Sequence, residues 1–148
     1  MYSSKNRGFT LIELVVVITI LGILAAFAIP RFIALDSTAR AATINGLSGS
    51  VRSASALARG LSMATGNTAS VTMEGTAVAL AFGYPDSTVT GINNAINIST
   101  GDFTVVNTAT TATWTKVGAT TPASCTVVYT AATSLTVPPS VLATTGGC

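Results

Sequence analysis

The side chains with the most definite chemistry in this sequence are two cysteines, Cys125 and Cys148. The chain has no histidine, and the two thiols lack the spacing of metal ligands, so we expect no metal centre. A disulfide between them is the favoured interpretation. It would close the loop 125–148 and place this half of the chain in a periplasmic or extracellular compartment. Two free thiols in a cytosolic protein are the alternative.

The acids of the second half of the chain give little support to catalysis. Glu74, Asp86 and Asp102 are widely separated and lie next to turn residues, which predicts solvated loop acids. Without histidine, no Ser-His or Cys-His pair is available. A calcium site would require several of these oxygens to converge, which their spacing does not indicate. We therefore expect no enzyme, no metal and no cofactor.

A single acid in a long apolar run, Glu13, is the third chemical feature. Residues 9–29 are apolar except for Thr10, Glu13 and Thr19. A helix of about 21 residues spans about 31 Å, which matches the hydrocarbon core of a bilayer. An ionised carboxylate costs about 2.5–3.5 kcal/mol at the centre of such a helix. Glu13 is therefore expected either to pair with a cation or to lie close enough to the interface to reach water.

The composition of the whole chain favours lipid or protein neighbours. Only 8% of its 148 residues are charged and the mean hydropathy is +0.63, whereas an ordinary soluble domain is roughly 25% charged. Lys5 and Arg7 are two of seven basic residues, so the chain beyond residue 8 has five basic and five acidic side chains. This balance excludes a basic nucleic-acid-binding surface, and the length allows one modest head domain.

The apolar pattern predicts one long helix, from about Phe9 to about Met63, ending near Gly66 and Asn67. After Pro30 its apolar face narrows to residues that recur at steps of three and four, which we expect to pack on a sheet: Ile44, Leu47, Val51, Ala54, Ala58 and Leu61. The basic side chains Arg52 and Arg59 are expected on a solvated face.

From Ala69 onward the composition is that of strands, rich in Thr and Val with turn residues between the runs. We expect a tight turn at Glu74-Gly75 and a break at residues 83–86. Pro138-Pro139 should end the last strand, and the tract 108–121 should contain mobile loops. The predicted strands are residues 70–73, 76–82, 103–106, 111–117, 125–130 and 134–137.

Three interpretations compete for the first thirty residues. A secretory signal peptide would be cut after a small-x-small site, and Ala26-Phe27-Ala28 fits one, but the apolar run is long for a signal and contains Glu13. A plain membrane anchor explains the span and leaves Glu13 without a role. The third interpretation rests on the residues at the boundary between the polar start and the apolar run, from Gly8 to Leu14.

The residues Gly8-Phe9-Thr10-Leu11-Ile12-Glu13-Leu14 support this third interpretation, because the segment resembles the processing site of type IV prepilins in a nearly continuous match from Gly8 to Phe32. The resemblance implies that a prepilin peptidase cuts after Gly8 and methylates the new amine of Phe9. It also implies that Glu13 accepts the amine of a neighbouring subunit's Phe9 and sets its register. Gly22 and Pro30 match positions between which the helix of such subunits unwinds in the filament.

The resemblance implies an α+β class with the type IV pilin fold: a long N-terminal α-helix whose C-terminal half packs on an antiparallel β-sheet head closed by a C-terminal disulfide. The expected domains are a leader peptide (1–8), a membrane and filament-core helix (9–30), an amphipathic helix continuing into the head (31–63) and a β-rich head (64–148) with the disulfide loop 125–148. Within the family, short motifs resemble the mannose-sensitive haemagglutinin group: Gly83-Tyr84-Pro85, Gly91-Ile92, the strand from Cys125 to Tyr129 and Gly147-Cys148.

The implied function is that of a major pilin, which polymerises with itself into a surface fibre for adhesion, biofilm formation, motility or DNA uptake. Its partners would be the inner membrane before assembly, the peptidase and assembly machinery, and host or surface ligands, on a Gram-negative bacterial cell. The alternatives are a pseudopilin of a type II secretion system, which the two cysteines disfavour, and a minor pilin. A monomeric membrane-anchored binding protein would instead keep residues 1–8.

Overall fold

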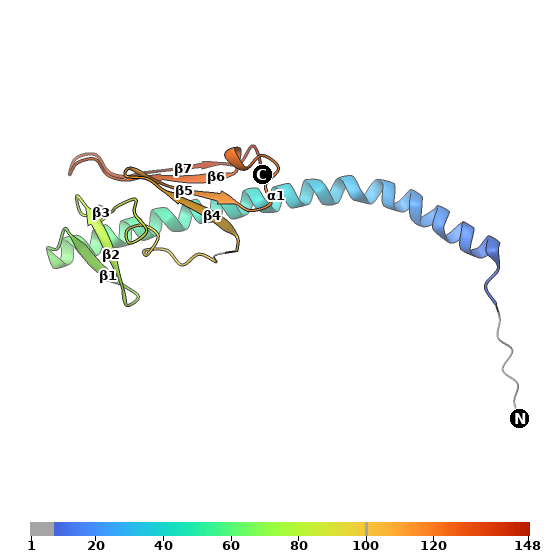
Figure 1. Ribbon diagram of the computed structural model, residues 1–148, viewed down its shortest axis with the longest axis horizontal. Coiled ribbons are helices and arrows are strands. Elements are labelled where there is room, and N and C mark those ends of the chain that lie inside the picture. Colours follow the sequence, from blue (N-terminus) through green and yellow to red (C-terminus); the bar gives the residue numbers. More distant parts are fainter. Residues whose placement is uncertain (1–7, 100) are drawn as a thin grey trace, which may run out of the picture. The chain divides into compact units, whose positions relative to one another are not determined.

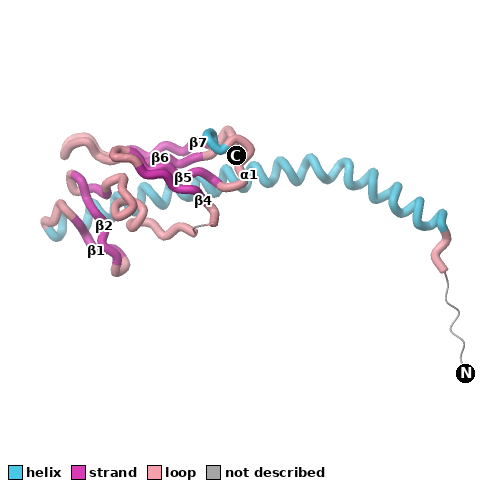
Figure 2. Tube along the Cα trace, viewed as in Figure 1, coloured by secondary structure: helices cyan, strands magenta, loops and turns pink. Residues whose placement is uncertain are grey.

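The structure, a computed structural model, describes residues 8–99 and 101–148. The predicted leader, with Lys5 and Arg7, lies outside the described residues except for Gly8. The chain divides into two compact units, one up to Asp36 and one from Ser37 to Cys148, and each is treated by itself below. Figure 1 gives the positions of the elements along the chain, and Figure 2 separates helix, strand and loop.

One helix, α1, contributes to both units and runs from Leu11 to Thr65. The predicted helix, residues 9–63, is confirmed within two residues at each end. The helix ends where Gly66 takes a φ of +70°, a conformation that glycine adopts without steric cost at helix C-termini. Asn67 then receives a hydrogen bond at its main-chain oxygen from the hydroxyl of Ser62, 2.8 Å away, which fixes the exit of the chain.

The part of α1 in the second unit buries one face against the sheets. Of the six residues predicted on this face, four are buried and two, Ala54 and Leu61, are half-buried; the four are Ile44, Leu47, Val51 and Ala58. The prediction missed Ser55 and Ser62, which are also buried. Serine is small enough to lie close to a strand, and its hydroxyl can bond within the buried layer, so apolar periodicity alone does not find it.

A small antiparallel sheet with the order β1-β2-β3 lies along the C-terminal part of α1 (Figure 1). It contains β1 (Ser70–Met73), β2 (Thr76–Ala81) and β3 (Tyr84–Pro85). The predicted turn is confirmed, with positive φ at both Glu74 and Gly75. The predicted break at residues 83–86 is confirmed in part. β2 ends at Ala81, and Phe82 and Gly83 take positive φ in a turn, but this turn brings the chain back so that β3 pairs with β2.

A second antiparallel sheet has the order β4-β5-β6-β7. Its strands are β4 (Phe103–Asn107), β5 (Thr111–Lys116), β6 (Thr126–Thr130) and β7 (Ser140–Thr144). The first three confirm predicted strands, and β5 occupies much of the tract 108–121 in which mobile loops were expected. Its Trp114 is only 1% exposed, so this part of the tract belongs to the core.

The prediction of the last strand, residues 134–137, is wrong. Residues 134–137 form only an isolated bridge between Ser134 and Val137, and β7 begins after Pro138-Pro139 instead of ending there. The reason is that β7 is an edge strand, paired on one side with β6. Proline lacks a donor, but at the start of an edge strand no ladder bond requires one.

The main core of the second unit lies between α1 and the four-stranded sheet. Ile44 and Val51 of the helix pack with Trp114, Val127 and Tyr129 of the strands, all of them buried. Cys125 and Cys148 belong to the same cluster and are joined by a disulfide, which confirms the predicted pairing. A smaller cluster, with Ala58, Val71, Met73 and Val78, joins the end of α1 to the three-stranded sheet.

Candidate assembly site

The start of α1 is built by Thr10 and Glu13, which form a capping box. The Glu13 oxygen Oε2 accepts a hydrogen bond from the Thr10 main-chain N–H at 2.9 Å and another from the Thr10 hydroxyl at 2.7 Å. In return, the Glu13 main-chain N–H donates to Thr10 Oγ1 at 3.3 Å. These bonds satisfy donors that have no partner within the first helical turn, and they hold the predicted assembly acid in a defined place.

The predicted processing site precedes this box. Gly8 and Phe9 lie before the first helical residue, and both are exposed; the Phe9 side chain keeps 79% of its accessible surface. A Cβ added at Gly8 would meet nothing within 4 Å. The peptide bond between Gly8 and Phe9 therefore lies in an exposed segment before the first helical residue.

The helical residues that follow carry an uncovered apolar surface. Among the side chains that the structure describes between Leu11 and Leu35, the large apolar ones are exposed, for example Leu11 at 80% and Phe27 at 75%. An 18-residue window of α1 has a mean hydropathy of 2.8 and none of it is buried. By length and composition this helix can cross a bilayer, and surface of this extent requires lipid or further protein to cover it.

Gly22 and Pro30 lie inside this segment without interrupting it. A Cβ at Gly22 would meet nothing within 4 Å, and α1 continues across Pro30. Pro30 has no N–H for the helical ladder, and Gly22 has a low helix propensity. The prediction that the stretch between these residues unwinds in a filament stays a prediction.

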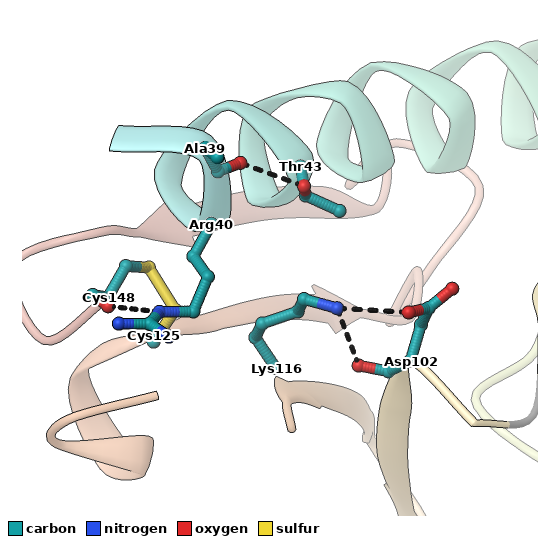
Figure 3. Close-up of a disulfide and its surroundings, with 7 residues drawn as sticks. All are labelled: Ala39, Arg40, Thr43, Asp102, Lys116, Cys125 and Cys148. Atoms are coloured by element: carbon teal, nitrogen blue, oxygen red, sulfur yellow. Dashed lines mark hydrogen bonds and ion pairs between the residues drawn. A yellow bond between two sulfur atoms is a disulfide. The ribbon is translucent and has the colours of Figure 1, made fainter. Parts of the chain in front are cut away.

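In the second unit, the disulfide lies directly beside α1 (Figure 3). Arg40 of the helix donates from Nε to the main-chain oxygen of Cys148 at 2.5 Å. Gly147 and Thr121 form a further bond, from Thr121 N–H to Gly147 O at 2.9 Å. The disulfide and these bonds hold the segment 121–148 against the helix.

Two more arginines of α1 donate to main-chain oxygens of the head. Arg52 Nη2 lies 2.7 Å from the carbonyl oxygen of Val141 in β7, and Arg59 Nη1 lies 3.3 Å from that of Phe82. The Arg59 guanidinium also lies over the Tyr84 ring, 4.8 Å from its centroid. Arg52 is exposed, as expected for a solvated face, whereas Arg59 is half-buried; the hydrogen bonds of both to the head were not predicted. Their acceptors are backbone atoms far away in the sequence, which residue types do not reveal.

Tyr129 forms the most buried polar contact between the two sheets. Its side chain has no exposed surface, and its hydroxyl donates to the Pro85 main-chain oxygen at 2.6 Å. Burial disfavours the phenolate and raises the pKa of Tyr129 to about 12. The hydrogen bond therefore joins β6 to β3 with the tyrosine in its neutral form.

The three acids of the head lie in three separate turns or loops. Glu74 is exposed in the β1–β2 turn, and Asp86 Oδ1 accepts bonds from the Thr88 N–H and hydroxyl. Asp102 is paired with Lys116 at 3.1 Å (Figure 3). Within residues 8–99 and 101–148, no group of three or more His, Cys, Asp or Glu side chains is placed to hold a metal ion.

Sequence reasoning missed two residues of this arrangement, Thr10 and Arg40. Thr10 had a local signal, because Thr-x-x-Glu before an apolar run is a capping-box pattern. Arg40 had none, because its acceptor lies 108 residues further along the chain.

Comparison with known proteins concerns mainly this N-terminal region. Residues 3–29 match the family described as the prokaryotic N-terminal methylation motif. The chain is 50% identical over 54 residues to the Type IV narrow pilus major component PilA5 of Thermus thermophilus, and these residues are 36% of this chain and 47% of the relative. No solved structure matches the chain.

Two further relatives are major pilins by name. The Type IV major pilin protein PilA of Myxococcus xanthus is 54% identical over 39 residues, which are 26% of this chain and 18% of the relative. The Type IV major fimbrial protein FimA of Dichelobacter nodosus is 53% identical over 45 residues, which are 30% of this chain and 27% of the relative. The chain thus spans less than half the length of these relatives.

The family match, residues 3–29, contains Gly8, Phe9, Glu13 and Gly22. The chain carries a prokaryotic N-terminal methylation motif and is similar over part of its length to type IV major pilins, and its helix-on-sheet head with the disulfide Cys125–Cys148 is consistent with the type IV pilin fold.

Proposed function

We propose that this chain is the major structural subunit of a type IV pilus, which polymerises with its own copies through the N-terminal helix. The observation that carries the proposal is a methylation motif at the start of a helix whose apolar surface is uncovered from Leu11 to Leu35. Such a surface is stable in lipid before assembly and among identical helices afterwards. The pilin names of the relatives support the major-subunit role over a pseudopilin.

The proposed processing step is cleavage after Gly8 by a prepilin peptidase, followed by methylation of the Phe9 amine. The accessible, non-helical segment at Gly8 and Phe9 supports this step. In the filament, the Glu13 carboxylate accepts the Phe9 amine of a neighbouring copy, which supplies the cation that an acid in an apolar environment requires. The apolar contacts supply most of the cohesion, and the pairing sets the register.

We propose that four segments of the chain have separate roles: a leader (1–8), a membrane and filament-core helix (9–30), an amphipathic helix (31–63) and a head (64–148). The boundary between the two compact units, after Asp36, supports a change of role near residue 31. We place the precursor in the inner membrane of a Gram-negative cell and the mature subunit in the surface fibre. Gly22 and Pro30 would give the core helix its compliance.

We further propose that the head belongs to the mannose-sensitive haemagglutinin group of pilins. Three of the four motifs that resemble this group are bonded to one another: the Tyr129 hydroxyl bonds Pro85 O, and Cys125 is bonded to Cys148. Expression in a bacterium that lacks its own pilin of this group tests the assignment. Restored fibres in the sheared fraction are expected, and their absence alongside normal membrane levels would contradict it.

The major-pilin proposal is tested by the mature N-terminus and by sheared filaments. Mass spectrometry should find a chain that starts at methylated Phe9, whereas an intact Met1 would indicate an anchor and a start at Ile29 ordinary secretion. Glu13→Ala should leave the protein cleaved and in the membrane but without filaments. Glu74→Ala, which removes an exposed acid of the head, is the matched control and should assemble normally.

A further inference from the structure

Thr10 contacts the predicted assembly acid in three ways. Its main-chain N–H and its hydroxyl both donate to Glu13 Oε2, at 2.9 and 2.7 Å, and its Oγ1 accepts the Glu13 main-chain N–H at 3.3 Å. The carboxylate is thereby held at one oxygen by a residue of its own chain. Any second copy that approaches Glu13 meets a side chain that is already oriented.

We propose that Thr10 is a positioning residue for subunit assembly: it holds the Glu13 carboxylate through Oε2 and leaves Oε1 to accept the amine of a second copy of this chain. The inference rests on the proposed function, in which the neighbour's Phe9 amine pairs with Glu13. It adds a residue to that pairing and assigns the two carboxylate oxygens different partners.

The surroundings of the carboxylate support this division. Within the residues that the structure describes, no hydrogen bond to Oε1 of Glu13 is present, and a carboxylate oxygen can accept about two bonds. Glu13 lies with Phe9, Ile12, Val16 and Val17 around a cavity of about 340 Å³ on the surface of the helix. All five residues are exposed, so a second copy that covers these apolar side chains would exclude water from the carboxylate and strengthen a charge-assisted bond to it.

The same bonds are available before and after processing. The Thr10 N–H and hydroxyl both lie beyond the bond between Gly8 and Phe9, so cleavage removes neither donor. Only the Phe9 nitrogen changes, from an amide to an amine. An ionised acid in an apolar environment needs donors at every stage. Thr10 supplies them while the subunit is alone, and the neighbour adds one when it arrives.

Holding the carboxylate in advance also favours binding. A free glutamate side chain loses rotamer freedom when it is fixed, and this cost opposes association. In the capping box, the Glu13 side chain has already lost this rotamer freedom when the helix forms, so the loss no longer opposes association. The incoming amine then meets one orientation of the acid, which is what a defined axial register between subunits requires.

Filament yield tests the proposal with three matched variants in a bacterium that has the assembly machinery and lacks its own major pilin. Thr10→Val keeps the shape but removes the hydroxyl and should lower the yield of sheared filaments by about tenfold. Thr10→Ser restores the hydroxyl and should stay within about twofold of the unmodified chain. Thr19→Val is the control, because the Thr19 hydroxyl bonds the Val15 main-chain oxygen at 2.7 Å and is not involved with Glu13.

An infrared measurement separates this proposal from the proposed function. Glu13 and Glu74 are the only glutamates, so Glu74→Gln leaves one carboxylate to be observed in the ¹³C-glutamate-labelled full chain in detergent. Thr10→Val should shift its carboxylate band, whereas Thr10→Ser and Thr19→Val should not. An unchanged band in Thr10→Val overturns the positioning role, whatever the filament yield. A shifted band with normal filament yield also overturns it. A shifted band without filaments in any chain, the unmodified one included, refutes self-assembly instead.

Discussion

Arg40 and Cys148 are joined by a hydrogen bond from the arginine Nε to the cysteine main-chain oxygen, 2.5 Å long, although they lie 108 residues apart. The bond links the helix to the end of the disulfide loop. It also leads to a first prediction. Arg40→Gln should lower the free energy of unfolding by about 1–2 kcal/mol, because it removes a charged donor from a half-buried carbonyl.

Denaturant unfolding of the full chain in detergent measures this effect. The single tryptophan, Trp114, is buried in the head, so its fluorescence reports on this unit. Arg31→Gln is the control, since Arg31 is exposed on the same helix and its loss should change stability by less than about 0.5 kcal/mol. Equal effects of the two substitutions would contradict the role of Arg40.

The disulfide should make a large contribution to the stability of the head. Replacement of Cys125 and Cys148 together by alanine opens a loop with a sequence separation of 23 residues and should cost about 3 kcal/mol in the chain-entropy description. Reduction of the unmodified chain should cause a similar loss, measured by the same fluorescence transition. If neither treatment moves the midpoint, the segment 125–148 is held by its other contacts alone.

Gly83 occupies a position that no other residue fits. Its φ is +76°, and an added Cβ would lie 2.1 Å from Arg59 Nη1 and 3.1 Å from Ser62 Oγ. Gly83→Ala should therefore displace Arg59 from Phe82 O and destabilise the head by about 1–3 kcal/mol.

A second glycine provides the control for this prediction. Gly60 lies in α1 with nothing within 4 Å of an added Cβ. Gly60→Ala should stabilise the helix by up to about 1 kcal/mol. The two substitutions should thus have opposite signs in the same unfolding experiment. Destabilisation of similar size by both would show that the close approach of Arg59 is unimportant.

The raised pKa of Tyr129 should make the head less stable at alkaline pH. Its pKa is raised from 10.0 to about 12, so above pH 10 the folded chain keeps a proton that the unfolded chain has released. The contribution of this protonated tyrosine to the free energy of unfolding is complete below pH 10. It is lost as pH rises through 12, at about 1.4 kcal/mol per pH unit. Other groups titrate in this range, so the comparison with Tyr129→Phe isolates the effect.

Tyr129→Phe should lower stability at pH 7, because Pro85 O loses its donor, by about 1 kcal/mol. Between pH 10 and 12 its stability should fall less steeply than that of the unmodified chain, so the two curves converge and then cross. Parallel curves across this range would show that burial of the tyrosine hydroxyl does not set its titration.

Much of the fold was predictable where the signal is local. The helix, the Glu74-Gly75 turn and the strands from residue 103 to residue 130 follow from periodicity and turn chemistry. The last strand was misplaced because Val137 and Val141 have similar strand propensity. Only the pairing of β7 with β6, from Thr126↔Thr144 to Thr130↔Ser140, decides between them, and that pairing depends on the course of the chain through the whole head.

The sequence by itself determined features that depend on neighbouring residues: the Gly8-Phe9 motif before the helix and an apolar helix long enough for a membrane. The capping box of Thr10 with Glu13 is equally local, but it was recognised only in the structure. Only the tertiary structure decided which main-chain carbonyl oxygens accept hydrogen bonds from Arg40, Arg52 and Arg59. The physical reason is that a capping box closes over three residues, whereas the acceptors of these arginines are main-chain atoms, identical in every residue, which become distinct only once the head has folded against the helix.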